Sequence, residues 1–316
     1  MSPYISVIIT AYNRKQYLLN AVSSAIDQSL PKDLYEIIVA KNFYDDYVDA
    51  KLNDAGIRAI YSDQKKSGAM VADALNQARG EIISFLDDDD EFVSTKLDSV
   101  FKAFALGTDY HYNNQKTMND AGDIIGARIR PSFITNDKQK YLNFFIQRRL
   151  GFNNSSISVR RKIIEEEIEA LKRINLSVDT FYLVCYLLHG NKLFYDGRPL
   201  TVYRVRQKYK NSRSQGLKVF ADQEIKRADL FAQDYNLMLN ITRGTPYEIL
   251  PKFRLSWAKA MRAEFSIYSK KDIDEILTPV DFIRLIEFQP RKSIHWSRVI
   301  LLQWLPKKVK QILISY

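Results

Sequence analysis

Four consecutive aspartates, Asp87 to Asp90, follow directly on an apolar run in the stretch EIISFLDDDDEF. Adjacent carboxylates repel one another, and their oxygens are the hard ligands that magnesium, manganese and calcium prefer. A divalent ion bound there would cancel the repulsion and could bridge to a diphosphate. The alternative is a solvated acidic loop or the acidic first turn of a helix. The run favours a metal site, and its position in the fold bears on the choice.

The segments before the aspartates alternate between strand and helix. Short apolar, β-branched runs predict buried strands at residues 4–10, 35–40, 57–62 and 81–86. The spacing of apolar residues predicts helices at 16–29, 45–56 and 67–80, the last two ending in glycine. This alternation is typical of a parallel sheet with helices on both faces.

Ligands bind at the carboxyl ends of the strands in such a sheet. Three polar loops are predicted to meet at that rim: AYNR at residues 11–14, KNFYDD at 41–46, and the four aspartates. The rim position strengthens the interpretation of the aspartates as a metal site.

The pattern after the aspartates is looser. Residues 94–107 predict a helix that begins with a capping box of Thr95 and Asp98. Further predictions are a hairpin within 108–131, helices at 136–149, 162–174 and 178–190, a strand at 154–161, and two short strands within 192–207. From about residue 217 the pattern is helical. The expected fold class is α/β with a helical C-terminal extension.

Composition restricts the classes of function. A chain of 316 residues forms one large or two modest domains. The net charge of +10 suggests an anionic partner, such as a nucleic acid, a phosphorylated substrate or lipid headgroups. The single cysteine, Cys185, excludes a disulfide framework and a cysteine-based metal site. The sequence shows neither a signal peptide nor a run of about 20 apolar residues, so we expect a cytoplasmic chain that is soluble or attached to a membrane surface.

Residues 5 to about 206 resemble a family 2 glycosyltransferase with a GT-A fold. The stretches that carry the resemblance, in the family's order and spacing, are SVIITAYNRKQYLLNAVSSAIDQS, YEIIVAKN, GAMVADALNQARGEIISFLDDDDEF, VDTFYLVCYLLHG and RPLTVYRVRQ. The resemblance implies a Rossmann-like, mostly parallel sheet flanked by helices. It implies a transferase domain over residues 1–215, with a nucleotide-binding half (1–107) and an acceptor-binding half (108–215), followed by a helical region (216–316).

The resemblance also implies a donor site. Asp89 would bind a divalent metal, Mn²⁺ or Mg²⁺, that holds the diphosphate of a nucleoside-diphosphate sugar, and Asp87 or Asp88 would face the ribose. The other donor-binding residues it implies are Thr10, Tyr12 and the Lys41–Asn42 region around the base, and the segment from Lys66 to Gly68 near the diphosphate.

Two further residues complete the implied site. Asp179 matches the family's catalytic base, whereas the residues alone favour a helix N-cap for an aspartate in this position. Arg206, in the basic stretch YRVRQKYK, would stabilise the leaving diphosphate, and the alternative is an exposed basic edge strand.

The sequence departs from the family pattern at several positions. Lys41 and Asn42 stand where the family commonly has two aspartates, Val178 replaces a glutamate, and Met70 to Ala72 replace Ala-Arg-Asn. Arg206 stands where many relatives have a histidine. These departures leave the donor's nucleobase open and admit a divergent or inactive relative.

The last 29 residues, from Phe288, contain no acidic residue and alternate basic with apolar groups. This pattern suits an amphipathic helix at an anionic membrane interface. The alternative is a C-terminal helix that packs on the core or on a second subunit. We expect peripheral binding to the cytoplasmic face of a membrane.

The predicted function is an inverting transfer of a sugar to an acceptor hydroxyl, which a lipid-linked glycan or a polyprenyl phosphate could supply. The rival predictions are a catalytically silent glycan-binding relative, a nucleotidyltransferase and a basic nucleic-acid-binding protein. TAYNRKQY lacks the glycines that cradle phosphates, which counts against the nucleotidyltransferase. No nucleic-acid-binding module is recognisable in the sequence, so nucleic acid is not an expected partner.

Overall fold

The computed structural model describes residues 4–127, 129–148, 153–205, 216–269 and 277–288. The chain forms two compact units. The first consists of Met1–Tyr141 and Gly151–Arg206, and the second of Leu142–Leu150 and Gln207–Tyr316. The predicted tail, like Arg206, lies outside the described residues.

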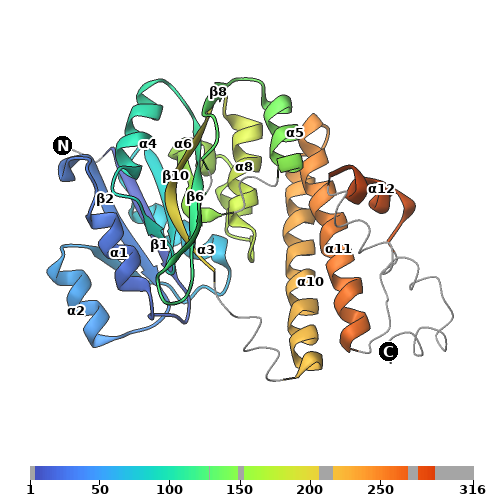
Figure 1. Ribbon diagram of the computed structural model, residues 1–316, viewed down its shortest axis with the longest axis horizontal. Helices are drawn as coiled ribbons and strands as arrows, with labels where there is room; N and C mark the ends of the chain where they lie inside the picture. The colour runs from blue at the N-terminus through green and yellow to red at the C-terminus, as the bar shows by residue number, and fades with distance from the viewer. Residues whose placement is uncertain (1–3, 128, 149–152, 206–215, 270–276, 289–316) are drawn as a thin grey trace. The chain divides into compact units, whose positions relative to one another are not determined.

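The first unit begins with the predicted alternation of strands and helices (Figure 1). Its elements are β1 (Ile5–Ala11), α1 (Leu18–Ile26), η1 (Lys32–Leu34), β2 (Tyr35–Lys41), α2 (Asp46–Asp54), β3 (Arg58–Tyr61), α3 (Ser67–Gln77) and β4 (Ile82–Asp87). The four strands are parallel in the order β3-β2-β1-β4. Residues 82–86 of β4 are buried, as expected for a strand covered on both faces.

The sheet continues with elements from the second half of this unit. These are β5 (Glu91–Phe92), α4 (Lys96–Ala105), β6 (Tyr110–Met118), β7 (Ile124–Ala127), β8 (Phe133–Thr135), η2 (Asn154–Ser156), β9 (Ile157–Arg160), α6 (Arg161–Glu165), α7 (Ile168–Leu171), α8 (Val178–His189) and β10 (Leu193–Arg204). The helix α5 (Lys138–Arg148) begins in this unit and continues in the second. The sheet order beyond β4 is β9-β6-β10-β5, and β9 is antiparallel to both of its neighbours. The sheet is therefore parallel in its first part and mixed in its second.

Helices cover both faces of the sheet, as predicted (Figure 1). One apolar core joins β1 and β4 to the buried faces of α1, α2 and α4. On the other face, α3 contacts β1 and β2, and α8 contacts β9. The first turns of α3 and α8 belong to this second face, and their side chains reach the carboxyl end of the sheet.

Three local predictions were wrong. Residues 193–204 form one strand instead of two, because irregularities between Asp196 and Thr201 shift the register of β10 with β6 without ending the pairing. The helix predicted at 162–174 is divided into α6 and α7. Thr95 makes no side-chain cap on α4, and Gln28 instead accepts the Leu97 N–H at 2.9 Å.

The described part of the second unit is helical, in agreement with the predicted extension. Its helices are α10 (Leu217–Ile241), η3 (Pro246–Glu248), α11 (Ile249–Ser269) and α12 (Pro279–Phe288). Aromatic side chains join α10 to α11, with Phe231 5.5 Å from Trp257 and Phe220 5.6 Å from Phe265 between ring centroids. Among the residues that the structure describes, no helix combines the length and the apolarity that a membrane crossing needs.

Candidate active site

A cavity of about 230 Å³ lies at the carboxyl ends of β1 and β4, beside the first turns of α3 and α8. It brings together Thr10, Asp87 and Asp179, three of the residues that the sequence marked as site residues. The remaining lining residues are Ser67, Val71, Asn153, Asn154, Leu176, Val178 and Tyr203. This is the rim at which the polar loops were predicted to meet.

The four aspartates have four different surroundings. Asp87 ends β4 and lines the cavity. Its Oδ1 accepts a hydrogen bond from Asn154 Nδ2 at 2.8 Å, and its backbone N–H donates to Ser155 Oγ at 3.0 Å. Burial, followed by the charges of Asp90 and Asp89, raises the pKa of Asp87 well above its usual range. This carboxylate would be stabilised by an added cation.

Asp88 is paired with Arg14. Arg14 Nε donates to Asp88 Oδ2 at 2.9 Å, and Nη2 of the same guanidinium binds Asp88 Oδ1. Asp88 is almost fully buried and does not line the cavity. Of the two aspartates that were predicted to face a ribose, Asp87 is the one at the cavity.

Asp90 is held by three donors. Asn153 Nδ2 and Ser155 Oγ donate to its Oδ2 at 2.9 and 2.7 Å, and the Arg204 N–H donates to its Oδ1 at 3.0 Å. Burial and then the charge of Asp89 raise the pKa of Asp90 to about 6, although these hydrogen bonds act in the opposite direction. Asp90 therefore ties β4 to η2 and β10.

Asp89 is the predicted metal ligand, and 14% of its side chain is exposed. Its Oδ2 lies 3.6 Å from Arg14 Nη1, and its backbone carbonyl accepts from Arg204 Nε at 3.0 Å. Within the described ranges, no three side chains of His, Cys, Asp or Glu converge to form a closed metal site. A magnesium-type ion bound by one or two carboxylates together with substrate phosphates needs no such cage, so Asp89 fits this kind of ligation.

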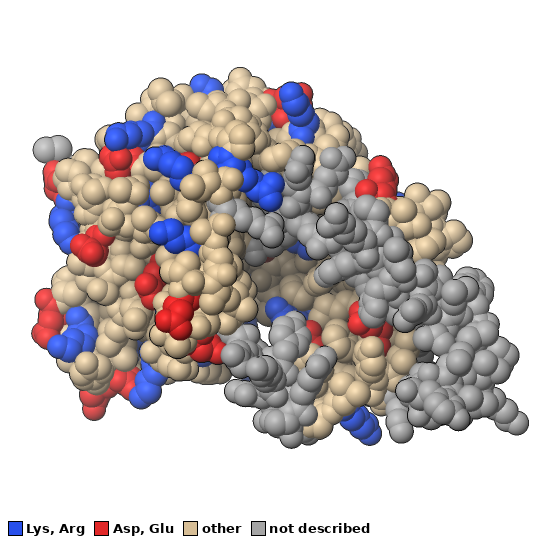
Figure 2. Space-filling model, in the orientation of Figure 1, with Lys and Arg blue, Asp and Glu red and all other residues tan. Residues whose placement is uncertain are grey.

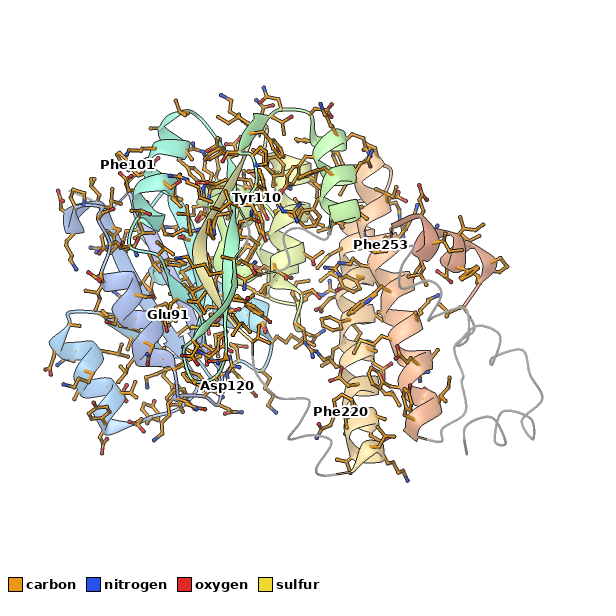
Figure 3. All side chains as sticks on the ribbon, in the orientation of Figure 1. Glu91, Phe101, Tyr110, Asp120, Phe220 and Phe253 are labelled. Carbon is orange, nitrogen blue, oxygen red and sulfur yellow. The ribbon has the colours of Figure 1, made fainter. Side chains whose placement is uncertain are left out.

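Arg204 supports the aspartate run from β10. Its guanidinium donates to Glu91 Oε1 at 3.0 Å and lies 4.1 Å from the centre of the Tyr17 ring. The Tyr17 hydroxyl in turn donates to the carbonyl of Asp120 at 3.4 Å, and Figure 3 labels Glu91 and Asp120 in the same region. Arg204 belongs to the basic stretch YRVRQKYK, but the sequence did not indicate that this side chain is buried and holds the backbone of the run.

Asp179 occupies the first turn of α8 and is partly exposed. Its interpretation as the N-cap is wrong, because Ser177 is the N-cap and Asp179 already lies inside the helix. Its Oδ1 accepts the Thr180 N–H at 2.6 Å. Residues 180–187 are all buried, so the helix is a fixed support for this carboxylate.

The predicted base-pocket residues lie at the ends of β1 and β2. Tyr12 is exposed, whereas Lys41 is buried and forms an ion pair with Asp49 at 2.8 Å. Asn42 Oδ1 accepts the Asn13 N–H at 2.6 Å, and Asn42 Nδ2 donates to Asn13 Oδ1 at 2.9 Å. The amide of Asn42 thus fixes the loop after β1, with one N–H left beyond these two contacts.

Gly68 lies in the first turn of α3, packed against the chain at Leu171. A Cβ at this position would lie 1.9 Å from the carbonyl oxygen of Leu171, so packing alone accounts for the glycine. The N–H groups of Ser67 and Gly68 donate to the carbonyls of Asn175 and Ile174. Contact of this segment with a diphosphate would therefore need other groups, such as the Ser67 side chain in the cavity.

Sequence reasoning missed Asn153, Asn154 and Ser155, which hold Asp87 and Asp90. The polar run NNSS at residues 153–156, which overlaps the start of the strand predicted at 154–161, was the available signal. It also missed an aromatic pair at the ends of β2 and β3, where Tyr44 and Tyr61 stack with ring centroids 4.5 Å apart.

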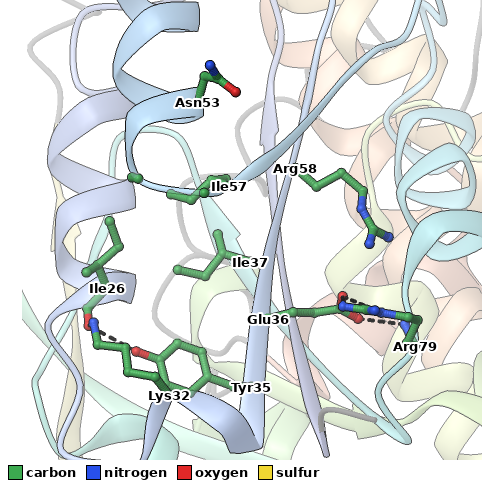
Figure 4. A pocket seen from close by; sticks show the side chains of 11 residues that line it. Ile26, Lys32, Tyr35, Glu36, Ile37, Asn53, Ile57, Arg58 and Arg79 are labelled. Carbon is green, nitrogen blue, oxygen red and sulfur yellow. Dashed lines mark hydrogen bonds and ion pairs between the residues drawn. The ribbon is translucent and has the colours of Figure 1, made fainter. Parts of the chain in front are cut away.

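A larger hollow of about 470 Å³ lies at the opposite, amino ends of β2 and β3 (Figure 4). Its cations are already engaged. Lys32 donates to the Ile26 carbonyl at the end of α1, and Arg58 donates to the Gln77 carbonyl at the end of α3. Arg79 forms an ion pair with Glu36 at 2.9 Å. The contacts of Lys32 and Arg58 cap helix ends, and the candidate catalytic groups lie at the other rim.

Comparisons with known proteins agree with this geometry. The model of the family described as Glycosyl transferase family 2 matches residues 6–168, more than half of the chain. The chain belongs to glycosyl transferase family 2. The matched residues include the first three stretches that carried the resemblance, with the four aspartates, and continue through β9.

Two curated relatives are glucosyltransferases. The GalNAc(5)-diNAcBac-PP-undecaprenol beta-1,3-glucosyltransferase of Campylobacter jejuni is 27% identical over 216 residues, which cover 64% of this chain and 65% of the relative. The UDP-Glc:alpha-D-GlcNAc-diphosphoundecaprenol beta-1,3-glucosyltransferase WfgD of Escherichia coli is 26% identical over 139 residues, 42% of this chain and 54% of the relative. The match thus spans less than two thirds of either relative.

Solved structures show the same fold. S. aureus TarS 1–349 in complex with UDP-GlcNAc matches with a TM-score of 0.59 and 15% identity, covering 99% of this chain and 89% of that one. TarS has a GT-A fold. The predicted fold class, a GT-A sheet flanked by helices with a helical C-terminal extension, is therefore confirmed.

Proposed function

We propose that this chain is an inverting glycosyltransferase that moves a sugar from a nucleoside diphosphate to an acceptor hydroxyl on a lipid-linked glycan. The observation that carries the proposal is that Asp87 and Asp179 line the same cavity, at the carboxyl ends of the parallel strands. The family membership supports sugar transfer. The printed names of the two glucosyltransferases support a diphosphoundecaprenol-linked acceptor, and the UDP-GlcNAc complex of TarS supports a uridine diphosphate donor.

In this proposal Asp179 takes the proton from the acceptor hydroxyl. The hydroxyl oxygen then attacks the anomeric carbon while the bond from that carbon to the diphosphate breaks, so the nucleoside diphosphate leaves with the electron pair. One base on the side opposite the leaving group gives inversion of the anomeric configuration. The first turn of α8 holds the base in place during the transfer.

The donor is held from the other side of the cavity. Thr10 and Tyr12 would contact the nucleoside, Asp87 the ribose, and Asp89 a divalent ion bound with the diphosphate. Such an ion supplies Lewis-acid stabilisation of the leaving group. The additional roles proposed for Asn42, Gly68 and Arg206 rest on the family resemblance, and Arg206 lies outside the described residues.

We extend the proposal to location and organisation. An acceptor linked to a lipid requires the enzyme to work at a membrane surface, and the basic tail after Phe288 would supply that contact from the cytoplasmic side. The transferase domain would comprise residues 1–215, and the helical region residues 216–316. The face of the first unit drawn in Figure 2 carries acidic as well as basic side chains, which gives no support to nucleic-acid binding there.

Calorimetry with UDP-, GDP- and dTDP-sugars, with and without Mn²⁺, tests the donor half of the proposal. We expect one donor to bind in a metal-dependent way in the wild type, and to lose that dependence in Asp89→Ala. Incubation with the bound donor and diphosphoundecaprenol-linked glycans tests transfer, and NMR of the product's anomeric proton tests inversion. Donor binding without transfer to any acceptor would favour the silent relative, and binding of no donor would refute the proposal.

A further inference from the structure

Arg14 lies in the loop after β1, and the fold directs it at the aspartates. The residue before it, Asn13, has φ of 53°, in the left-handed region that few residues other than glycine adopt. Asn42 holds this conformation through the two hydrogen bonds between the Asn13 and Asn42 amides. The hydrogen bonds with Asn42 hold the loop in this strained conformation, and the conformation fixes the direction of Arg14.

The guanidinium of Arg14 is divided between two aspartates. It binds both carboxylate oxygens of Asp88 and lies 3.6 Å from Asp89 Oδ2. Asp88 has 2% of its side chain exposed, whereas Arg14 has 35% exposed. Partial burial opposes the charge of Arg14, but Asp88, Asp89 and Asp87 outweigh it and raise the pKa of Arg14 above its usual value. The positive charge is thus permanent and stands beside the predicted metal ligand.

A fixed cation at this place affects a free metal ion and a metal–nucleotide complex in opposite ways. A divalent cation that approaches Asp89 alone is repelled by the guanidinium, because like charges a few ångströms apart repel one another several times more strongly near a protein surface than in bulk water. A nucleoside diphosphate adds about three negative charges, so its complex with a divalent ion carries net negative charge and is attracted by the same group.

We propose that Arg14 is a positioning residue that makes metal binding at Asp89 depend on the nucleotide diphosphate. In the absence of donor it serves as the counter-cation of the aspartate run and keeps Asp88 away from the metal. When a nucleoside diphosphate binds, its roughly three negative charges balance the guanidinium and the divalent ion together. The inference rests on the proposed function for its ligand, a nucleoside diphosphate, and concerns the coupling between two ligands.

The test measures Mn²⁺ binding by calorimetry, or by the EPR signal of free Mn²⁺, with and without UDP. In the wild type we expect UDP to tighten Mn²⁺ binding at least about tenfold. In Arg14→Gln we expect Mn²⁺ alone to bind about tenfold more tightly than in the wild type, and the enhancement by UDP to shrink by the same factor. By reciprocity, the enhancement of UDP binding by Mn²⁺ shrinks equally.

Two variants serve as controls. Arg14→Lys keeps the charge and loses the two-pronged contact with Asp88, so we expect its Mn²⁺ affinity without UDP to stay within about threefold of the wild type. Lys15→Gln removes the neighbouring positive charge, which pairs with Asp45 and not with the run, and should leave both affinities unchanged. Arg14→Lys also keeps the test readable if Arg14→Gln does not fold, because loss of the coupling in a charge-conserving variant refutes a role of the charge.

Unchanged affinity for Mn²⁺ alone in Arg14→Gln would overturn the proposal, as would equal changes in Arg14→Gln and Arg14→Lys. Failure of the proposed function has a different signature. In that case wild-type protein binds no nucleoside diphosphate at all, while the comparison of wild type and Arg14→Gln with Mn²⁺ alone still reports on the guanidinium.

Discussion

Replacing Asp179 with asparagine separates catalysis from folding at the candidate base. The substitution keeps the size of the side chain and its acceptor for the Thr180 N–H, but removes the ability to take a proton. A positioned general base typically contributes 10²- to 10⁴-fold to the rate. We therefore expect Asp179→Asn to lower kcat by about 10²- to 10⁴-fold, which corresponds to about 3 to 5 kcal/mol in the activation free energy.

The structural cost of the same substitution is small. The carboxylate lies in the first turn of α8, where a negative charge is worth about 0.3 to 1 kcal/mol through the helix dipole. A loss of that size lowers Tm by roughly 1 to 4 °C in a protein of this order of length. Donor affinity should be unchanged, because Asp179 acts on the acceptor.

Release of nucleoside diphosphate in the presence of acceptor gives kcat, and calorimetry gives the donor Kd. Asp46→Asn is a matched control, since Asp46 is an exposed acidic residue in the first turn of α2 and does not line the cavity. Activity of Asp179→Asn within tenfold of the wild type would refute the assignment of the base. A large loss of Tm together with activity would show that the residue is structural.

Three further predictions concern stability. Gly68→Ala places a Cβ 1.9 Å from the Leu171 carbonyl oxygen and should lower the unfolding free energy by roughly 3 kcal/mol. The control Gly56→Ala meets no atom within 4 Å but has a φ of 66°, so it should lower the unfolding free energy by only about 1 to 2 kcal/mol. Equal losses for the two variants in denaturant unfolding would contradict the packing argument. Ser155→Ala removes a donor to Asp90 and the acceptor of the Asp87 N–H, so calorimetry should show a loss of about 1 to 3 kcal/mol in unfolding free energy. A loss below about 0.5 kcal/mol would contradict this structural role of Ser155. Burial lowers the pKa of Lys96 to about 7 from its usual 10.5. Below pH 7 Lys96 is protonated in both states, so the folded protein carries the full penalty of burying the charge. Between pH 7 and 10.5 only the unfolded state is protonated. With rising pH in this range, the unfolding free energy of the wild type should therefore increase relative to that of Lys96→Met by up to about 1.4 kcal/mol per pH unit. Unfolding of both proteins at one pH below 7 and at one pH between 7 and 10.5 measures the difference between their unfolding free energies. A difference that does not change with pH would contradict the lowered pKa of Lys96.

The first half of the fold could be predicted because its signals are local. Each strand from β1 to β4 is a short apolar run, and each connecting helix has its own apolar face and a stop, so periodicity suffices. The second half depends on pairing between distant segments. β9 inserts between β4 and β6, and β10 runs parallel to β6 across an irregular stretch, and neither arrangement leaves a trace in the spacing of apolar residues.

The same distinction applies to the site. The rim of the sheet and the aspartate run follow from topology, and the family resemblance marked Asp179. The contacts that give each aspartate its character come from residues far away in the sequence: Arg14 reaches Asp88 across 74 positions, and Asn154 reaches Asp87 across 67. Such contacts require the tertiary structure, which is why Arg14 and Asn154 were not recognised from the sequence.

These contacts answer the question that four adjacent carboxylates raise. Arg14 neutralises Asp88, and three donors hold Asp90 between β4 and β10, so two of the four side chains are occupied in keeping the run folded. Asp87 reaches the cavity, and Asp89 keeps part of its carboxylate exposed beside a guanidinium. Burial, and then the charges of the neighbouring aspartates, raise the pKa of Asp87 and of Asp90. A run built in this way tolerates its own repulsion in the free protein. Under the proposal above, the exposed part of the Asp89 carboxylate is what remains for a metal that binds together with its nucleotide.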